Sequence, residues 1–170
     1  MRVFVETQKF NQTWLRVLLI SVGLVTLWPA LSLTEWDHVD TSSLIIISSC
    51  IALTLGMVVY LLVLLRLETR IDEHGISYGF EPLPGKMNRK SWDEIESLYV
   101  REYSPIGEYG GWGYRLSFSK STGRAYNVSG NLGIQIELKN GKRVLVGTRK
   151  KEEAEAVINY YTKKDQNEAY

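Results

Sequence analysis

The side chains that most often carry out chemistry are scarce in this chain of 170 residues. It contains one cysteine, Cys50, and two histidines, His38 and His74. A structural zinc site usually takes about four Cys or His ligands, and nucleophilic catalysis pairs a hydroxyl or thiol with a neighbouring base. Neither histidine lies in a nucleophile motif, and both are expected at the surface, His74 in a turn and His38 in an exposed loop. We therefore expect no metal ion, no cofactor and no enzymatic activity.

The most unusual segment spans residues 103–115, where four glycines alternate with three tyrosines and one tryptophan. Tyrosine and tryptophan contribute much of the binding energy at protein interfaces. One interpretation is therefore a partner-binding loop that uses Tyr109, Trp112 and Tyr114. The alternative is a connection between strands in which Trp112 closes a β barrel. The segment is not a P-loop, because no Gly-Lys-Ser or Gly-Lys-Thr and no helical pattern follows it.

A second candidate site is a loop that carries the basic residues Lys86, Arg89 and Lys90. Such a cluster can contact anionic lipid headgroups, with about 1 kcal/mol per basic residue near the membrane surface. The alternative is a solvated loop, since Asp93 and Glu94 follow closely. The formal net charge of the whole chain is only +1, which argues against nucleic-acid binding that depends on bulk electrostatics.

Two apolar segments precede these candidate sites. Residues 15–33 contain one charge, Arg16 at their start, and residues 44–65 contain none. A hydrocarbon core about 30 Å thick requires ~20 helical residues, so both segments can span a membrane. The short link, residues 34–43, predicts an antiparallel hairpin. The alternative, a signal peptide in residues 1–33, is disfavoured because the apolar stretch exceeds the usual length of about 7–15 residues.

The distribution of charge predicts the orientation of this hairpin. The link between the spans contains no Lys or Arg, whereas basic residues flank the spans on the other side, among them Lys9, Arg16, Arg66 and Arg70. Basic residues favour the cytoplasmic side of a membrane protein. We therefore expect a multi-pass protein of the plasma (inner) membrane with both termini in the cytoplasm.

Small residues recur at a spacing of four within the second span, at Ser48, Ala52 and Gly56. Small side chains at this spacing allow another helix to approach closely. That helix is either the first span of the same hairpin or a helix of a second copy of the chain. Neither span has an Asp, Glu or Lys near its middle, which disfavours transport and proton relay.

From residue 67 onward the pattern changes to short strands separated by turns. Asn140-Gly141 between two apolar runs is the strongest hairpin signal, and Glu73-His74-Gly75 marks another tight turn. The expected strands lie in residues 67–73, 76–82, 114–119, 124–129, 133–139 and 142–148, and residues 89–103 contain two candidate short strands, around Trp92 and over Leu98–Tyr103. This region is therefore expected to be mainly β, with about seven antiparallel strands.

A helical pattern follows the last of these strands. Ala154, Val157, Ile158 and Tyr161 recur at i, i+3, i+4 and i+7 and form one apolar stripe. Thr148 is the expected N-cap. We expect the stripe to be buried against an open end of the sheet.

The order of these elements resembles a pleckstrin-homology-like (PH-like) barrel of the bacterial type. The resemblance is carried by residues 73–76 (EHGI), residues 92–95 (WDEI), residues 134–146 around Asn140-Gly141, and the final helix. The whole chain is similar to small bacterial membrane proteins with two spans and a cytoplasmic PH-like domain. The resemblance implies a β barrel closed by a C-terminal helix. The first hairpin loop, His74-Gly75, lacks the basic residues that grip inositol phosphates in eukaryotic PH domains, so we expect no specific phosphoinositide binding.

These observations together predict three regions: residues 1–66 as an N-terminal tail and a two-helix membrane hairpin, residues 67–162 as the cytoplasmic PH-like domain, and residues 163–170 as a flexible tail. The expected function is that of a membrane-anchored, non-enzymatic interaction or scaffold module that contacts the lipid bilayer and a protein partner or a second copy of itself. The alternative is an accessory or assembly subunit of a larger membrane protein complex.

Overall fold

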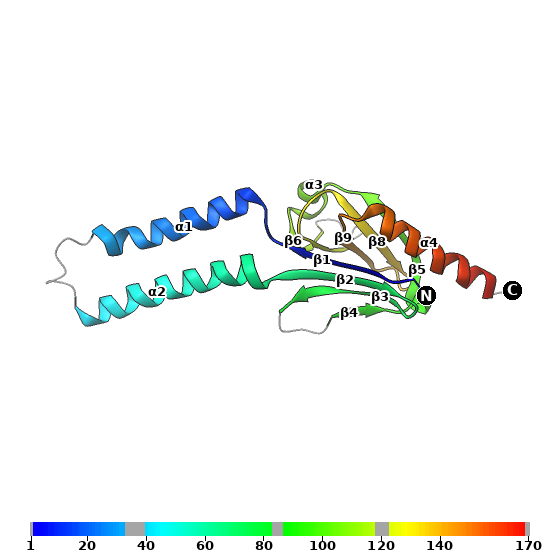
Figure 1. Cartoon of the computed structure of the whole chain (residues 1–170), viewed down its shortest axis with the longest axis horizontal. Coiled ribbons are helices and arrows are strands. Elements are labelled where there is room, and N and C mark those ends of the chain that lie inside the picture. Colours follow the sequence, from blue (N-terminus) through cyan, green and yellow to red (C-terminus); the bar gives the residue numbers. More distant parts are fainter. Residues whose placement is uncertain (1, 33–39, 83–86, 118–122, 169–170) are drawn as a thin grey trace. The chain divides into compact units, whose positions relative to one another are not determined.

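The computed structural model describes residues 2–32, 40–82, 87–117 and 123–168. The chain divides into two compact units (Figure 1). A helical unit consists of Lys9–Leu65, and a mainly β unit combines Met1–Gln8 with Arg66–Tyr170.

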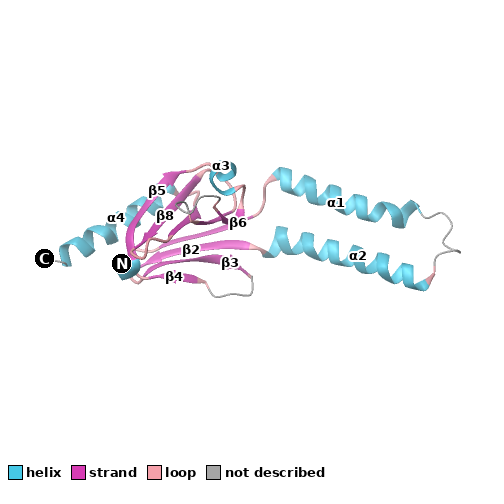
Figure 2. Ribbon diagram, turned by 180° about the vertical axis from the view of Figure 1, so that it is seen from behind, coloured by secondary structure: helices cyan, strands magenta, loops and turns pink. Residues whose placement is uncertain are grey.

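The helical unit contains α1 (Thr13–Ser32) and α2 (Thr41–Val59), and α2 continues as a π-helical turn over Tyr60–Leu64. The two helices are in contact and lie side by side (Figure 2). The half-buried residues of α1 include Leu15, Leu19, Gly23 and Thr26, and those of α2 include Ile47, Ile51, Thr54 and Val58. Each set recurs at helical spacing and forms one stripe, so these residues make the interface between the two helices.

One helix, Thr41–Leu64, is long and apolar enough to cross a membrane, with a mean hydropathy of 2.4 over its most apolar window. None of that window is buried by the rest of the protein. Asp40 caps the helix, because its Oδ2 accepts hydrogen bonds from the backbone N–H groups of Ser42 and Ser43. The apolar stretch that the structure describes in α1, Thr13–Thr26, is shorter than the helix Thr41–Leu64.

The first sheet of the β unit has four strands in the order β1 (Phe4–Lys9), β2 (Arg66–Asp72), β3 (Gly75–Glu81) and β4 (Asn88–Lys90). The expected tight hairpin is confirmed, because β2 pairs antiparallel with β3 from Arg66↔Glu81 to Asp72↔Gly75. Gly75 adopts a φ of +128° at this turn, and a Cβ there would lie 2.0 Å from the carbonyl oxygen of Lys90 in β4. Only glycine fits this close approach.

The second sheet has five strands in the order β5 (Ile95–Glu102), β8 (Leu132–Leu138), β9 (Arg143–Gly147), β7 (Arg124–Asn127) and β6 (Gly113–Leu116). The hairpin at Asn140-Gly141 is confirmed as the β8–β9 pair. A 3₁₀ turn, Trp92–Glu94, leads into β5, and a short helix, α3 (Pro105–Tyr109), joins β5 to β6.

Two expectations about the β region were wrong. The described residues form nine strands in two separate sheets rather than a closed barrel of about seven. The strands are also not all antiparallel, since β9 inserts between β7 and β8 and runs parallel to β7. Both differences come from long-range pairing that local turn signals do not encode.

The C-terminal helix, α4 (Lys151–Glu168), packs against β5. Its expected apolar stripe, Ala154, Val157, Ile158 and Tyr161, is buried. The ring of Tyr161 also stacks on Trp92 with 5.3 Å between ring centroids. The helix begins at Lys151 rather than directly after Thr148, so Thr148 is not its N-cap.

The sequence analysis did not assign β1, which lies within residues expected to be an N-terminal tail. Its residues alternate between buried and exposed, and Phe4, Glu6 and Gln8 point inward. The Glu6 side chain accepts hydrogen bonds from Thr148 Oγ1 (2.6 Å) and the Arg149 N–H (2.9 Å). Gln8 Nε2 donates to the carbonyl oxygen of Gly147 (2.8 Å). The first residues of the chain therefore belong to the β unit.

Candidate functional site

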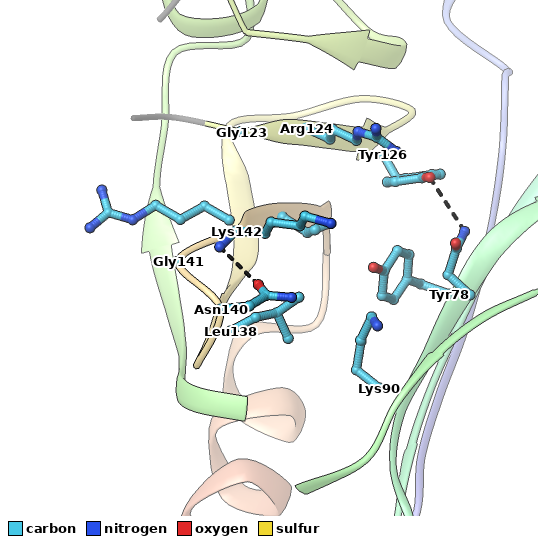
Figure 3. A pocket seen from close by; sticks show the side chains of 12 residues that line it. Tyr78, Lys90, Gly123, Arg124, Tyr126, Leu138, Asn140, Gly141 and Lys142 are labelled. Atoms are coloured by element: carbon cyan, nitrogen blue, oxygen red, sulfur yellow. Dashed lines mark hydrogen bonds between the residues drawn. The ribbon is translucent and has the colours of Figure 1, made fainter. Parts of the chain in front are cut away.

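A cavity of about 420 Å³ lies between the two sheets of the β unit (Figure 3). The first sheet contributes residues of β3 and β4 to its lining. The second sheet contributes the start of β7, the first residues of β9 and the turn between β8 and β9. The two sheets are not joined into a barrel. Side chains from both sheets therefore line the space between these strands.

The lining of this cavity is rich in positive charge. Among the described residues, the lining includes Lys90, Arg124, Lys142 and Arg143, and no Asp or Glu. Two of these cations have carboxylate partners outside the cavity: Lys90 Nζ lies 2.8 Å from Glu94, and Arg143 Nε lies 3.2 Å from Glu137.

The other two cations have no such partner. Within the part of the chain that the structure describes, neither Arg124 nor Lys142 forms an ion pair. Both side chains extend across the cavity towards the first sheet (Figure 3). The cavity is therefore a region of excess positive charge with two exposed cations at its rim.

Two tyrosines also line the cavity, Tyr78 from β3 of the first sheet and Tyr126 from β7 of the second. The rings of Tyr78 and Tyr126 meet edge to face with 5.1 Å between centroids, and Tyr126 Oη accepts a hydrogen bond from Asn88 Nδ2 (3.3 Å). Burial raises the pKa of both phenols, while the charge of Arg124 acts in the opposite direction on both. Both hydroxyls are therefore neutral at physiological pH and can donate or accept a hydrogen bond.

Gly123 and Asn140 fix the backbone that carries the basic residues. Gly123 adopts a φ of +79°, and a Cβ there would lie 1.9 Å from the carbonyl oxygen of Arg143. This contact sets Arg124, the next residue, beside β9. In the β8–β9 turn, Asn140 Oδ1 accepts a hydrogen bond from the backbone N–H of Lys142 (3.1 Å), which fixes the start of the returning strand.

The chemistry available in this cavity is recognition of an anion. Arginine and lysine supply charge and hydrogen-bond donors, and the tyrosine and asparagine side chains supply neutral polar groups. In the described residues no group of three or more His, Cys, Asp or Glu side chains is placed to hold a metal ion.

The three aromatic residues of the expected partner-binding loop differ in how exposed they are. Tyr109 ends α3 with only 1% of its surface exposed and belongs to a core cluster with Tyr103, Ala125 and Leu145. Its side chain is therefore not available to a partner. Trp112 is half-buried and its Nε1 donates to the carbonyl oxygen of Gly130 (3.2 Å). Tyr114, on β6, remains 49% exposed.

Ion pairing explains why this segment forms a helical turn rather than a flexible loop. Arg101 on β5 binds both carboxylate oxygens of Glu108, at 3.2 and 2.7 Å. This pairing lowers the pKa of Glu108 below its usual value. Ser104 caps α3 by accepting a hydrogen bond from the Gly107 N–H (3.2 Å), and Gly110 ends it in the left-handed conformation.

Tyr103, in the core beside α3, is expected to make the stability of the β unit depend on pH in the alkaline range. Burial raises the pKa of Tyr103 to about 12 from 10.0, although its hydroxyl accepts a hydrogen bond from Asn127 Nδ2 (2.9 Å). Below pH 10 the phenol is protonated in both the folded and the unfolded state. Between pH 10 and 12 only the unfolded state loses the proton, so the free energy of unfolding falls by about 1.4 kcal/mol per pH unit from this group.

The variant Tyr103→Phe tests this contribution. We expect it to be less stable than the wild type by about 1–3 kcal/mol at neutral pH, because buried Asn127 loses a partner. The difference should narrow as the pH rises from 10 to 12, as measured by denaturant unfolding of the full chain in detergent. A difference that stays constant over this range would show that Tyr103 ionises equally in both states.

Two of the three basic residues of the predicted lipid-contact loop lie in the described part of the chain. Lys86 lies outside the described residues. Arg89 and Lys90 are neighbours in β4 and therefore point to opposite sides of the strand. Arg89 lies 4.0 Å from Asp72, whereas Lys90 lines the cavity.

The small residues Ser48, Ala52 and Gly56 are exposed on α2. A Cβ at Gly56 would have nothing within 4 Å. The face of α2 that contacts α1 is instead formed by Ile47, Ile51, Thr54 and Val58, as described above. Packing inside the hairpin therefore does not use the small residues, and a contact with another helix stays a prediction.

The sequence analysis missed the cavity, although a local signal was present. Lys142 and Arg143 directly follow the Asn140-Gly141 turn, and Arg124 follows Gly123, so each basic residue lies next to a glycine turn. The sequence does not show that β7 and β9 are neighbours.

The chain matches no family model, no curated protein and no solved structure.

Proposed function

We propose that the protein is a membrane-anchored, non-enzymatic binding module, with a PH-like β unit held at the cytoplasmic face by a two-helix hairpin. The single observation that carries this proposal is the helix Thr41–Leu64, which is apolar, long and not buried by the protein. At 1.5 Å per residue, its 24 residues extend about 36 Å, more than the thickness of a bilayer core. A soluble protein would leave this apolar surface in water.

The place of the two helices in the chain, between β1 and β2 of the first sheet, supports a second membrane crossing. The chain leaves the sheet at the end of β1 and returns at the start of β2, and these are neighbouring strands that run in opposite directions (Figure 1). The segment between them starts and ends at the same end of these two strands, which favours an even number of membrane crossings. If α2 spans, α1 spans too, and its 20 residues extend about 30 Å.

Charge supports the cytoplasmic location. Arg66 and Arg70 lie in β2 directly after the long apolar helix, and Lys9 and Arg16 flank the start of α1. Residues 34–43 contain no Lys or Arg. Because basic residues next to a span favour the cytoplasmic side, this distribution supports a cytoplasmic β unit.

Reporter fusions test this topology. Alkaline phosphatase, which is active only in the periplasm, should be inactive when fused after Tyr170 and active when inserted in residues 34–43. A cytoplasmic reporter such as green fluorescent protein should give the opposite pattern at the same two sites. Phosphatase activity of the fusion after Tyr170 would contradict the proposal.

A second candidate function is that of an accessory subunit of a larger membrane complex. The observation in its favour is the exposed face of Ser48, Ala52 and Gly56, which leaves room for a helix of another protein. Purification of the tagged full chain in mild detergent separates the two. A stoichiometric foreign membrane protein supports the accessory subunit, whereas the chain alone or as a homo-oligomer supports the binding module.

A further inference from the structure

We propose that the cavity between the two sheets binds a small organic phosphate monoester, with Arg124 and Lys142 as the residues that contact the phosphate. This inference concerns the β unit alone. It goes beyond the membrane anchoring proposed above and does not depend on it.

The first argument is charge. Four basic residues line one cavity, and there is no carboxylate among the described residues of its lining. Lys90 and Arg143 are partly compensated by Glu94 and Glu137. Like charges gathered around one space repel one another, and Arg124 and Lys142 have no carboxylate partner in the described residues. An anion in the cavity would supply the missing counter-charge.

The second argument is the kind of anion. A phosphate monoester carries a charge of about −1.5 to −2 at pH 7 and offers three strong acceptor oxygens. The planar guanidinium of Arg124 can bind two of these oxygens at once, and the ammonium of Lys142 can bind the third as a point charge. A carboxylate carries a single negative charge and would leave one of these two cations uncompensated.

The third argument is the size of the cavity and the neutral polar side chains in its lining. A cavity of about 420 Å³ is larger than one phosphate ion requires and falls within the range of small-molecule sites. The lining also includes the neutral hydroxyl of Tyr78 and the Tyr126–Asn88 pair. These groups can hydrogen-bond to the organic part of the ligand, or contact it through their rings.

Binding is measured with the full chain in nanodiscs of neutral phosphatidylcholine, with phenyl phosphate as the probe and isothermal titration calorimetry as the readout. We expect binding that strengthens from pH 5 to pH 7, because the second ionisation of a phosphate monoester has a pKa of about 6. Phenyl sulfate, which keeps one charge over this range, should bind more weakly and without this pH dependence.

The double variant Arg124→Ala/Lys142→Ala should bind phenyl phosphate about tenfold or more weakly, since each removed hydrogen bond involves two charged groups. Both side chains are exposed, so the variant should fold, which circular dichroism checks. The matched control, Lys151→Ala/Lys163→Ala, removes the same charge from exposed positions of α4 and should bind like the wild type.

A second experiment tests whether the natural phosphate ligand is a soluble molecule or a lipid headgroup. Nanodiscs that contain phosphatidylinositol 4-phosphate should bind phenyl phosphate as neutral nanodiscs do, if the natural ligand is soluble. Loss of phenyl phosphate binding in these nanodiscs, restored in neutral ones, would support the same phosphate site with a headgroup as its source. The proposal is overturned if the wild type binds no phenyl phosphate in neutral nanodiscs, or if the double variant binds it as tightly as the wild type does.

Discussion

Ile158→Asp is expected to unfold the β unit or to open it to proteolysis. Ile158 is 3% exposed on the face of α4 that packs inward. The substitution removes apolar burial of about 1.5–3 kcal/mol and places a carboxylate without a partner in the core. A domain of this size has a total stability of only about 5–15 kcal/mol. Limited proteolysis of the full chain in detergent should therefore cleave the β unit of this variant rapidly.

The neighbouring position provides the control. Asn159 is exposed on the outer face of α4, so Asn159→Asp introduces the same carboxylate with little effect on protease resistance. If both variants resist the protease equally, α4 does not depend on its apolar stripe for packing. The arrangement of α4 against β5 would then not be a stabilising contact.

The sequence predicted well those elements that local patterns encode. Asn140-Gly141 can adopt a tight hairpin turn at low cost, and its flanking strands pair as expected. The stripe on α4 follows from helical periodicity, because only one face of a surface helix can be buried. In both cases a few neighbouring residues contain the whole signal.

β1 was not predicted because its inward-facing residues are mostly polar. Phe4 is apolar, but Glu6 and Gln8 are also buried, at 5% and 2% exposure. Their burial is compensated by hydrogen bonds to residues 147–149, which lie at the other end of the chain. Hydrophobic alternation therefore does not mark this strand, and its partners cannot be identified from its own sequence.

The cavity could not be predicted for a related reason. Arg124 and Lys142 come together because β7 pairs parallel with β9, from Arg124↔Val144 to Tyr126↔Val146. The short link between β7 and β8 instead indicates a simple antiparallel hairpin. Only the insertion of β9 between them brings Gly123 against Arg143 and sets the two basic segments side by side.

Glu6→Ala is expected to lower the free energy of unfolding of the β unit by about 3 kcal/mol. The Glu6 side chain is the acceptor for Thr148 Oγ1 and the Arg149 N–H. Hydrogen bonds to a charged group contribute about 1.5–3 kcal/mol each, and their loss leaves donors unsatisfied. The change also removes a connection between β1 and the segment that precedes α4, so the loss should appear in denaturant unfolding of the full chain.

Two further variants separate the hydrogen bonds from the intrinsic preferences of the strand. Glu6→Gln keeps one acceptor oxygen and the shape of the side chain, so its stability should lie between those of the wild type and Glu6→Ala. Thr7→Ala changes the next residue, which points outward in the same strand, and should cost less than about 1 kcal/mol because only β propensity changes. Equal losses for Thr7→Ala and Glu6→Ala would mean that β1 contributes as a strand alone. A loss confined to Glu6 would show that this buried carboxylate fixes the first strand of the protein to its last.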